Sequence, residues 1–89
     1  MPQEFDLQQN YPNPFNPSTQ IQYSLAESGA VNLSIYNMLG QKVAEIVNST
    51  QEAGNYQVTW NAGSLSSGVY IYRLSTKGNT FTKRMMLIK

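Results

Sequence analysis

The sequence contains no cysteine and no histidine among its 89 residues. Without cysteine there is no disulfide and no thiolate metal site, and the redox compartment cannot be inferred from cysteine usage. The absence of histidine removes the commonest general base and metal ligand. Asp6 is the only aspartate, and the four glutamates fall on separate predicted turns and strands, so that no catalytic carboxylate pair is indicated. These absences favour a non-catalytic chain that carries no cofactor and no metal.

Charged residues are also scarce, at 12%, and the formal net charge is +1. So small a charge argues against strong electrostatic attraction to nucleic acid or to a membrane surface. The longest apolar run, residues 85–88, is far too short to span a bilayer. The charges are nevertheless sorted, since all five acids precede residue 53 and five of the six bases follow residue 72. We expect no nucleic-acid partner and no direct membrane insertion.

Eighty-nine residues form one small domain, which has room for a two-layer core but not for a roomy catalytic cleft. Residues 1–4 are interpreted as an expression start or a linker remnant, and the folded domain is expected over residues 5–89. No signal peptide heads the chain, so we interpret it as the tail of a larger protein. In isolation the domain is expected to be monomeric.

Proline is concentrated in residues 10–19, which read NYPNPFNPST and are called the strap below. Each proline fixes φ and removes a backbone donor, so the strap can form neither a helix nor a central strand. Its short asparagine side chains can bond to nearby backbone groups. We interpret it as a rigid structural segment whose two aromatics plug one end of the core, because flexible linkers are poor in aromatics. Its structural residues are Tyr11, Pro12, Asn13, Pro14, Phe15, Asn16 and Pro17.

After the strap, short segments of alternating apolar and polar residues are separated by turns that contain glycine. This pattern predicts an all-β sandwich. Residues 41–47 alternate less strictly, which predicts a bulge or an edge position, and residues 48–53 are predicted to be a polar loop. Trp60 is expected to be the largest core residue. The predicted core consists of Ile21, Tyr23, Leu33, Ile35, Tyr56, Val58, Trp60 and Leu74.

Tyr70 lies at the start of a predicted strand, just after Gly68 and five residues after Leu65. This spacing suits a tyrosine corner, in which the hydroxyl bonds to upstream backbone. The alternative is an aromatic strip for sugar binding, which requires Tyr36, Tyr70 and Tyr72 to share a surface. We favour core and corner roles for these tyrosines.

The stretch KRMMLIK, residues 83–89, is where a function is most expected to show. One interpretation is an ordinary last strand whose basic residues protect its edge. The other is an address that presents a strand edge and positive charge to a receptor. The residues by themselves leave both interpretations open.

The strap is followed in order by IQYSL (21–25), IYNMLGQKVA (35–44), GNYQVTW (54–60), SGVYIYRL (67–74) and KRMMLIK (83–89). In combination these motifs resemble the type A C-terminal sorting domain of the type IX secretion system, also called the Por secretion system. The resemblance covers residues 5–89. It implies an immunoglobulin-like antiparallel β-sandwich of about seven strands at the end of a larger exported protein of Bacteroidetes and their relatives.

The function that the resemblance implies is a non-catalytic signal, which directs cargo through the outer-membrane translocon to the cell surface or the medium. The implied partners are outer-membrane components of that translocon and, commonly, a surface signal peptidase; the cargo travels by way of the periplasm. The residues that match the family's motifs, and so are implied in translocon recognition, are Gly68, Tyr70, Arg73, Lys83, Arg84, Met85, Leu87 and Lys89.

Two other hypotheses remain open at this point. The first is a β-sandwich binding module, for polysaccharide or for protein assembly, appended to a secreted hydrolase or adhesin. It requires tyrosines that are exposed together on one sheet. The second is a structural spacer, whose deletion would change neither export nor ligand binding.

Overall fold

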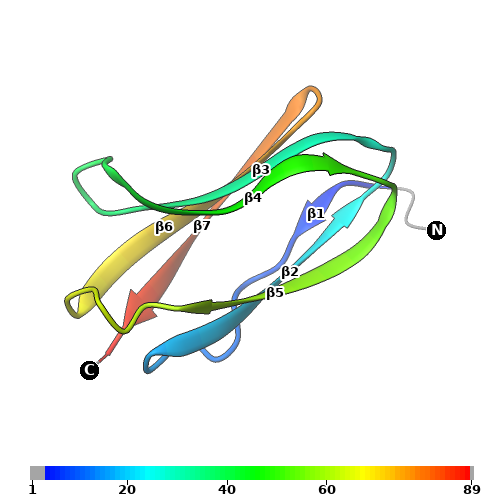
Figure 1. Cartoon of the computed structure of the whole chain (residues 1–89). Helices are drawn as coiled ribbons and strands as arrows, with labels where there is room; N and C mark the ends of the chain where they lie inside the picture. Colours follow the sequence, from blue (N-terminus) through cyan, green and yellow to red (C-terminus); the bar gives the residue numbers. More distant parts are fainter. Residues whose placement is uncertain (1–3, 89) are drawn as a thin grey trace.

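A computed structural model describes residues 4–88, which form seven β-strands and, within that range, no helix (Figure 1). The first two strands flank the strap and differ greatly in length. The strands are β1 (Asp6–Leu7), β2 (Ser18–Leu25), β3 (Gly29–Tyr36), β4 (Lys42–Gln51), β5 (Gly54–Asn61), β6 (Gly68–Thr76) and β7 (Asn79–Leu87).

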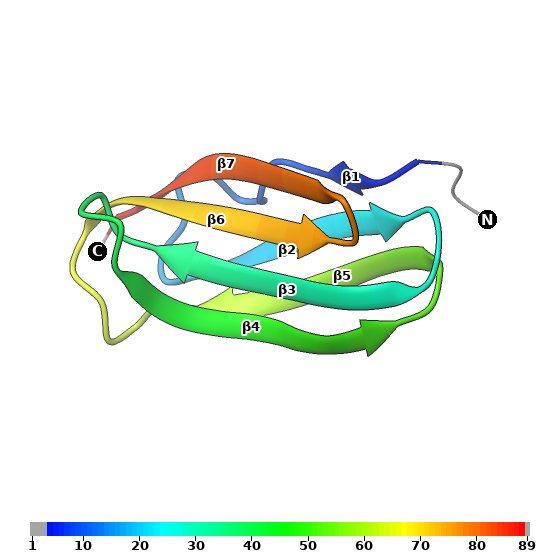
Figure 2. The same cartoon turned by 90° about the horizontal axis from the view of Figure 1, so that it is seen from above.

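The strands form two antiparallel sheets that pack face to face as a sandwich (Figure 1). The smaller sheet has the order β1-β2-β5, and the larger sheet has the order β4-β3-β6-β7. In a constant-type immunoglobulin domain the fourth strand belongs to the sheet of the first, second and fifth strands. Here β4 pairs with β3 instead, so that β4 and β7 are the edges of the larger sheet (Figure 2). The predicted all-β sandwich is confirmed.

The core lies between the sheets and is built from every second residue of the inner strands, as the alternating pattern predicts. Tyr23 and Tyr72 are the largest fully buried side chains. Five of the eight predicted core residues are completely buried, namely Ile21, Tyr23, Leu33, Ile35 and Leu74.

The other three predicted core residues, Tyr56, Val58 and Trp60, are only partly buried and pack against the core. All three lie on β5, an edge strand, where the larger sheet does not cover the inward face completely. The expectation that Trp60 is the largest core residue is therefore wrong, because it is only partly buried. Its ring still contacts buried aromatics, at 6.0 Å from the Phe15 ring and 6.5 Å from the Tyr70 ring between centroids.

Of the two predictions for residues 41–53, the one for residues 41–47 is confirmed and the one for residues 48–53 is wrong. Strand β4 lies at an edge and its register with β3 shifts twice, as the irregular alternation indicates. The predicted loop over residues 48–53 is wrong, because β4 continues to Gln51 and Asn48 pairs with Asn32. Backbone hydrogen bonds to β3 extend this strand through polar residues whose side chains give no apolar alternation.

The strap runs from β1 to β2 without regular structure, and its three X–Pro peptide bonds are cis. Phe15 is 2% exposed and belongs to the core, as predicted, whereas Tyr11 is 79% exposed. The prediction that Tyr11 plugs the core is therefore wrong. Tyr11 pairs through its backbone with Gln20, which faces solvent, and directly opposed residues share a face of a sheet.

Asn10 bears out the prediction that strap asparagines bond to nearby backbone. Its buried side chain donates to the carbonyl of Pro12 at 3.1 Å and to the hydroxyl of Thr19 at 3.0 Å. The Thr19 hydroxyl in turn donates to the same carbonyl at 2.9 Å. This network joins the two ends of the strap, since Asn10 and Thr19 are its first and last residues.

Candidate functional site

The β6–β7 hairpin brings most of the predicted recognition residues together. Gly68 lies opposite Leu87, Tyr70 lies opposite Met85, and Arg84 lies opposite Ile71. Two motifs that are about ten residues apart in the chain therefore form one continuous element. Lys89, the last predicted recognition residue, lies outside the described residues.

The hairpin separates these residues into two groups by the face on which they lie. Tyr70, Met85 and Leu87 point inward and are buried in the core. Arg73 and Arg84 are exposed on the opposite, outer face of the larger sheet. Since buried side chains cannot touch a partner of the folded domain, only Arg73 and Arg84 among these five residues offer direct contacts.

Lys83 and Gly68 fit neither group. Lys83 is half-buried on the inward side of β7, between Phe81 and Met85 in the alternation. Gly68 opens β6 with a φ of 153°, and no atom lies within 4 Å of the place where a Cβ would be. This conformation strains any residue with a side chain, so glycine is required there by the backbone.

The predicted tyrosine corner is confirmed at the start of β6. The Tyr70 hydroxyl donates a hydrogen bond to the carbonyl of Ser66 at 2.7 Å. Tyr56, near the start of β5, makes a similar bond. Its hydroxyl donates to the carbonyl of Glu52, which lies four residues upstream, in the turn before the strand. Each tyrosine ties the loop before its strand to the strand itself, which fixes where β5 and β6 begin.

The outer face carries two arginines without an acidic partner. The Arg73 guanidinium lies 4.9 Å from the centroid of the Tyr36 ring, a cation–π distance. Arg73 and Arg84 lie in neighbouring rows of side chains that run across the strands of the sheet. The row of Arg84 consists of Tyr36 on β3, Ile71 on β6 and Arg84 on β7. Neither guanidinium forms an ion pair within residues 4–88.

The one ion pair of the described chain joins Lys42 and Glu45, at 2.9 Å on β4. The hydrogen bond between them raises the pKa of the Lys42 amine and lowers the pKa of the Glu45 carboxyl. Glu45 also accepts a bond from Asn32 at 3.3 Å. Glu45, which the described strands place on this face opposite Ser34, is therefore already paired with Lys42 and forms no ion pair with either arginine.

The strap covers the outer edge of β7, a contact that the sequence does not reveal. The Phe15 amide donates to the Met86 carbonyl, and the Ile88 amide donates to the Phe15 carbonyl, both at 2.9 Å. The Met86 amide donates to Asn13 Oδ1 at 3.0 Å, and Gln9 Nε2 donates to the Arg84 carbonyl at 2.6 Å. A receptor strand cannot pair with this part of β7 while the strap is in place.

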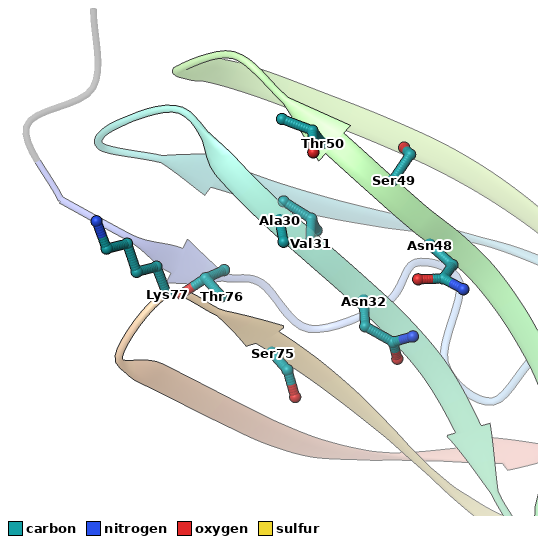
Figure 3. A pocket seen from close by; sticks show the side chains of 9 residues that line it. All are labelled: Ala30, Val31, Asn32, Asn48, Ser49, Thr50, Ser75, Thr76 and Lys77. Atoms are coloured by element: carbon teal, nitrogen blue, oxygen red, sulfur yellow. The ribbon is translucent and has the colours of Figure 1, made fainter.

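The aromatic strip that sugar binding requires is not formed. Tyr70 and Tyr72 are buried between the sheets, whereas Tyr36 lies on the outer face, so the three rings share no surface. A shallow groove of about 590 Å³ lies on the outer face, at the end of the sheet where β4 and β6 finish (Figure 3). Its nine lining residues, from Ala30 to Lys77, include no aromatic ring and no carboxylate. The favoured core and corner roles are confirmed for Tyr72 and Tyr70, whereas Tyr36, on the outer face, has neither role.

No group of three aspartate or glutamate side chains that could hold a metal ion occurs among the described residues. No helix of residues 4–88 is long and apolar enough to cross a membrane. The Tyr72 hydroxyl is buried, but it is fully engaged, since it accepts from the Asn10 amide and donates to the Gln8 carbonyl, both at 2.8 Å.

These features define a small β-sandwich domain in which the motifs SGVYIYRL and KRMMLIK form the last hairpin and the strap covers the edge of that hairpin. The chain matches a protein family described as the secretion system C-terminal sorting domain, over residues 9–89. It belongs to this family, and is therefore a non-catalytic C-terminal sorting domain of the type IX, or Por, secretion system, which acts as a secretion signal for cargo. Proteins with this domain are secreted or attached to the cell surface. A search of curated proteins found no match.

Proposed function

We propose that the domain is a type A sorting signal that outer-membrane components of the translocon read in its folded state, from the outer face of the β6–β7 hairpin. The observation that carries this proposal is the placement of Arg73 and Arg84 on one exposed face, without an ion pair among the described residues. Unpaired guanidinium groups are ready donors to carboxylates of a partner and steer its approach.

In this proposal the motif residues have two different tasks. Arg73 and Arg84 contact the machinery directly, and Lys89 extends the positive charge. Tyr70, Met85 and Leu87 act indirectly, because their burial holds the hairpin flat against the core. Lys83 is also indirect, since its half-buried stem covers the side of the sandwich.

Recognition of the face accounts for the structure better than strand addition to β7. The strap already supplies hydrogen-bond partners to Met86 and Ile88, and Gln9, just before the strap, supplies one to Arg84. Strand addition requires a row of unpaired backbone groups. The guanidinium groups, in contrast, are accessible without any rearrangement of the domain.

We further propose that the domain begins at Phe5 and that residues 1–4 lie outside it. Phe5 packs against the core, Leu7 is 3% exposed, and β1 pairs with β2. A surface signal peptidase is the second proposed partner, and its cut falls before Phe5, because proteases need a segment without fixed backbone pairing.

The test is export of a periplasm-directed reporter fused to residues 5–89, in a bacterium with a type IX secretion system. Single changes Arg73→Ala and Arg84→Ala are expected to lower the exported fraction severalfold, and the double change at least tenfold. Lys77→Ala is the matched control, because it removes one exposed positive charge from the turn between β6 and β7, at the far end of the hairpin.

Thermal unfolding of each purified variant separates recognition from folding. Both arginine side chains are exposed, so Arg84→Ala is expected to leave the midpoint nearly unchanged and Arg73→Ala to lower it only slightly, by the loss of its contact with Tyr36. If the folded double variant is exported as well as the unchanged domain, the arginines are not the recognised groups. If Lys77→Ala lowers export as much as the single arginine changes do, the translocon responds to the total positive charge of the domain and not to this face.

A further inference from the structure

The turn between β3 and β4, residues 37–41, is held by an unusually complete set of hydrogen bonds. The Asn37 side-chain oxygen accepts from the amides of Leu39 at 2.9 Å and Gln41 at 3.0 Å. The Asn37 side-chain nitrogen donates to Gln41 Oε1 at 2.8 Å. Backbone bonds run from the Asn37 amide to the Gln41 carbonyl and from the Gly40 amide to the Asn37 carbonyl. Gly40 supplies the φ of 83° that this turn requires.

Two large apolar side chains lie at the tip of this rigid turn. Leu39 is 84% exposed and Met38 is 58% exposed, the former being the most exposed large hydrophobe of the described chain. Turn positions ordinarily carry polar residues, glycine or proline. Because the hydrogen bonds fix the backbone of the turn, only the rotamers of the two side chains have to be ordered when they enter a pocket, which favours an interface anchor.

The turn is continuous with the outer face that carries the two arginines. Tyr36 ends β3 immediately before the turn and begins the row that leads through Ile71 to Arg84. Met86 lies in the next row, opposite Val69, and is 43% exposed. Apolar and positively charged groups thus adjoin one another over one end of the larger sheet.

Apart from Glu45, which stands opposite Ser34 on the same outer face, the acidic residues named here lie elsewhere. Glu27 is in the turn between β2 and β3 and Glu52 is in the turn between β4 and β5, at the opposite end of the sandwich (Figure 1). Asp6 opens β1 at that same end, and Glu45 is paired with Lys42. A partner that complements the end with the arginines therefore needs an apolar hollow with carboxylates beside it.

We propose that the turn 37–41 is an anchor, which inserts Met38 and Leu39 into an apolar pocket rimmed by carboxylates on a protein of the secretion machinery. This inference rests on the proposed function and adds a second contact region to the same surface. The partner is a protein and not a lipid surface because a fixed turn geometry is of use only against a shaped pocket. Membrane binding in addition requires a larger apolar face and more basic residues than this end provides.

The test uses the same reporter fusion with changes at the tip of the turn. Leu39→Ser is expected to lower the exported fraction at least fivefold, and Met38→Ser combined with Leu39→Ser at least twentyfold. Leu39→Met keeps the apolar volume and is expected to preserve export. Glu27→Ser, in a turn at the opposite end, is the matched control and is expected to have no effect.

A further variant tests the rigidity of the turn without altering its tip. Asn37→Ala removes the side-chain bonds to Leu39 and Gln41 and leaves both apolar side chains in place. Export is expected to fall by an intermediate factor, because the two side chains must then be ordered on binding. The thermal midpoints of the tip variants are expected to equal that of the unchanged domain, which excludes unfolding as the cause.

Two readouts identify the class of partner. A photoreactive benzoylphenylalanine in place of Leu39 is expected to crosslink to a translocon protein in living cells, and the same residue in place of Glu27 is not. The purified chain is expected not to sediment with vesicles of phosphatidylethanolamine and phosphatidylglycerol. Sedimentation that the Met38→Ser, Leu39→Ser variant abolishes would show a lipid partner and overturn the proposal.

The outcomes also separate this inference from the proposed function. Normal export of the folded double variant, together with loss of export on removal of the arginines, contradicts the anchor alone. Failure of the unchanged fusion to leave the periplasm contradicts the proposed function itself.

Discussion

The main-chain amide of Phe15 donates a hydrogen bond to the carbonyl of Met86 at 2.9 Å, across 71 positions of the chain. Together with the bond from Ile88 it places one strap residue beside β7 as a parallel bridge opposite Leu87. The strap is thus a short cover for the outer edge of the larger sheet, in addition to contributing an aromatic ring to the core. Exposed edges promote pairing between molecules, and covering them suppresses it.

The two strap aromatics are expected to differ sharply in their effect on stability. Phe15→Ala empties a fully buried position and should lower the free energy of unfolding by about 3–5 kcal/mol. Tyr11→Ala alters a side chain that is almost entirely in solvent and should change it by less than about 0.5 kcal/mol. Urea unfolding followed by tryptophan fluorescence measures both. Equal losses for the two variants would show that the strap acts as a unit and not through Phe15.

The Asn13 side chain is expected to protect the Met86 amide. Asn13→Ala removes the acceptor of that amide and should cost about 0.5–1.5 kcal/mol, since water replaces the lost partner at this exposed site. Hydrogen exchange of the Met86 amide should accelerate. Asn16→Ala is the control, because Asn16 is exposed and forms no side-chain hydrogen bond within the described chain. Unchanged exchange in the Asn13 variant would contradict the edge-covering role.

The buried Tyr72 hydroxyl links β6 to the segment that precedes the strap. Tyr72→Phe leaves the buried Asn10 amide and the Gln8 carbonyl without this partner, so a loss of about 1–3 kcal/mol is expected. Denaturant unfolding at neutral pH measures this loss. A variant as stable as the unchanged protein would mean that water replaces the hydroxyl.

The same tyrosine predicts how stability depends on alkaline pH. Burial raises the pKa of Tyr72 from 10.0 to about 12, and burial also raises the pKa of Tyr23. A raised pKa means that the folded state holds the proton more tightly, so the contribution is complete below pH 10 and is lost as pH rises toward 12. Unfolding free energy should fall over that window, and less steeply in Tyr72→Phe. An equal slope in both proteins would contradict the assignment.

The amino-terminal boundary of the folding unit can be tested by truncation. The family match begins at residue 9, but Leu7 is buried and β1 pairs with β2. A chain of residues 9–89 should therefore be less stable than a chain of residues 5–89, by about 2 kcal/mol or more for the loss of one buried leucine and its pairing. Thermal unfolding compares them. Equal midpoints would place the boundary at residue 9.

Alternation along the strands predicts the architecture well, because inward and outward positions repeat every two residues wherever one face is buried. Ile21, Tyr23 and Leu33 follow this rule and are buried. The rule says nothing about how fully the opposite sheet covers an edge strand, so Trp60 is more exposed than expected. It also misses the polar end of β4, where pairing with β3 extends the strand.

The site could be predicted only in part. The motifs locate the β6–β7 hairpin, and alternation along β7 already separates outward Arg84 and Met86 from inward Met85 and Leu87. The contact between the strap and β7 depends on the packing of segments about 70 residues apart, for which no local pattern exists. The exposure of Leu39 was equally hidden, because a leucine in a turn can point into a core or away from it.

The export role of the domain is tested most directly by the location of a periplasm-directed reporter fused to residues 5–89 in a bacterium with a type IX secretion system, compared with the same reporter lacking the domain. We expect that only the fusion reaches the cell surface or the medium, and that it does so in cells with a functional translocon and not in cells without one. A fusion that folds yet stays in the periplasm would contradict it.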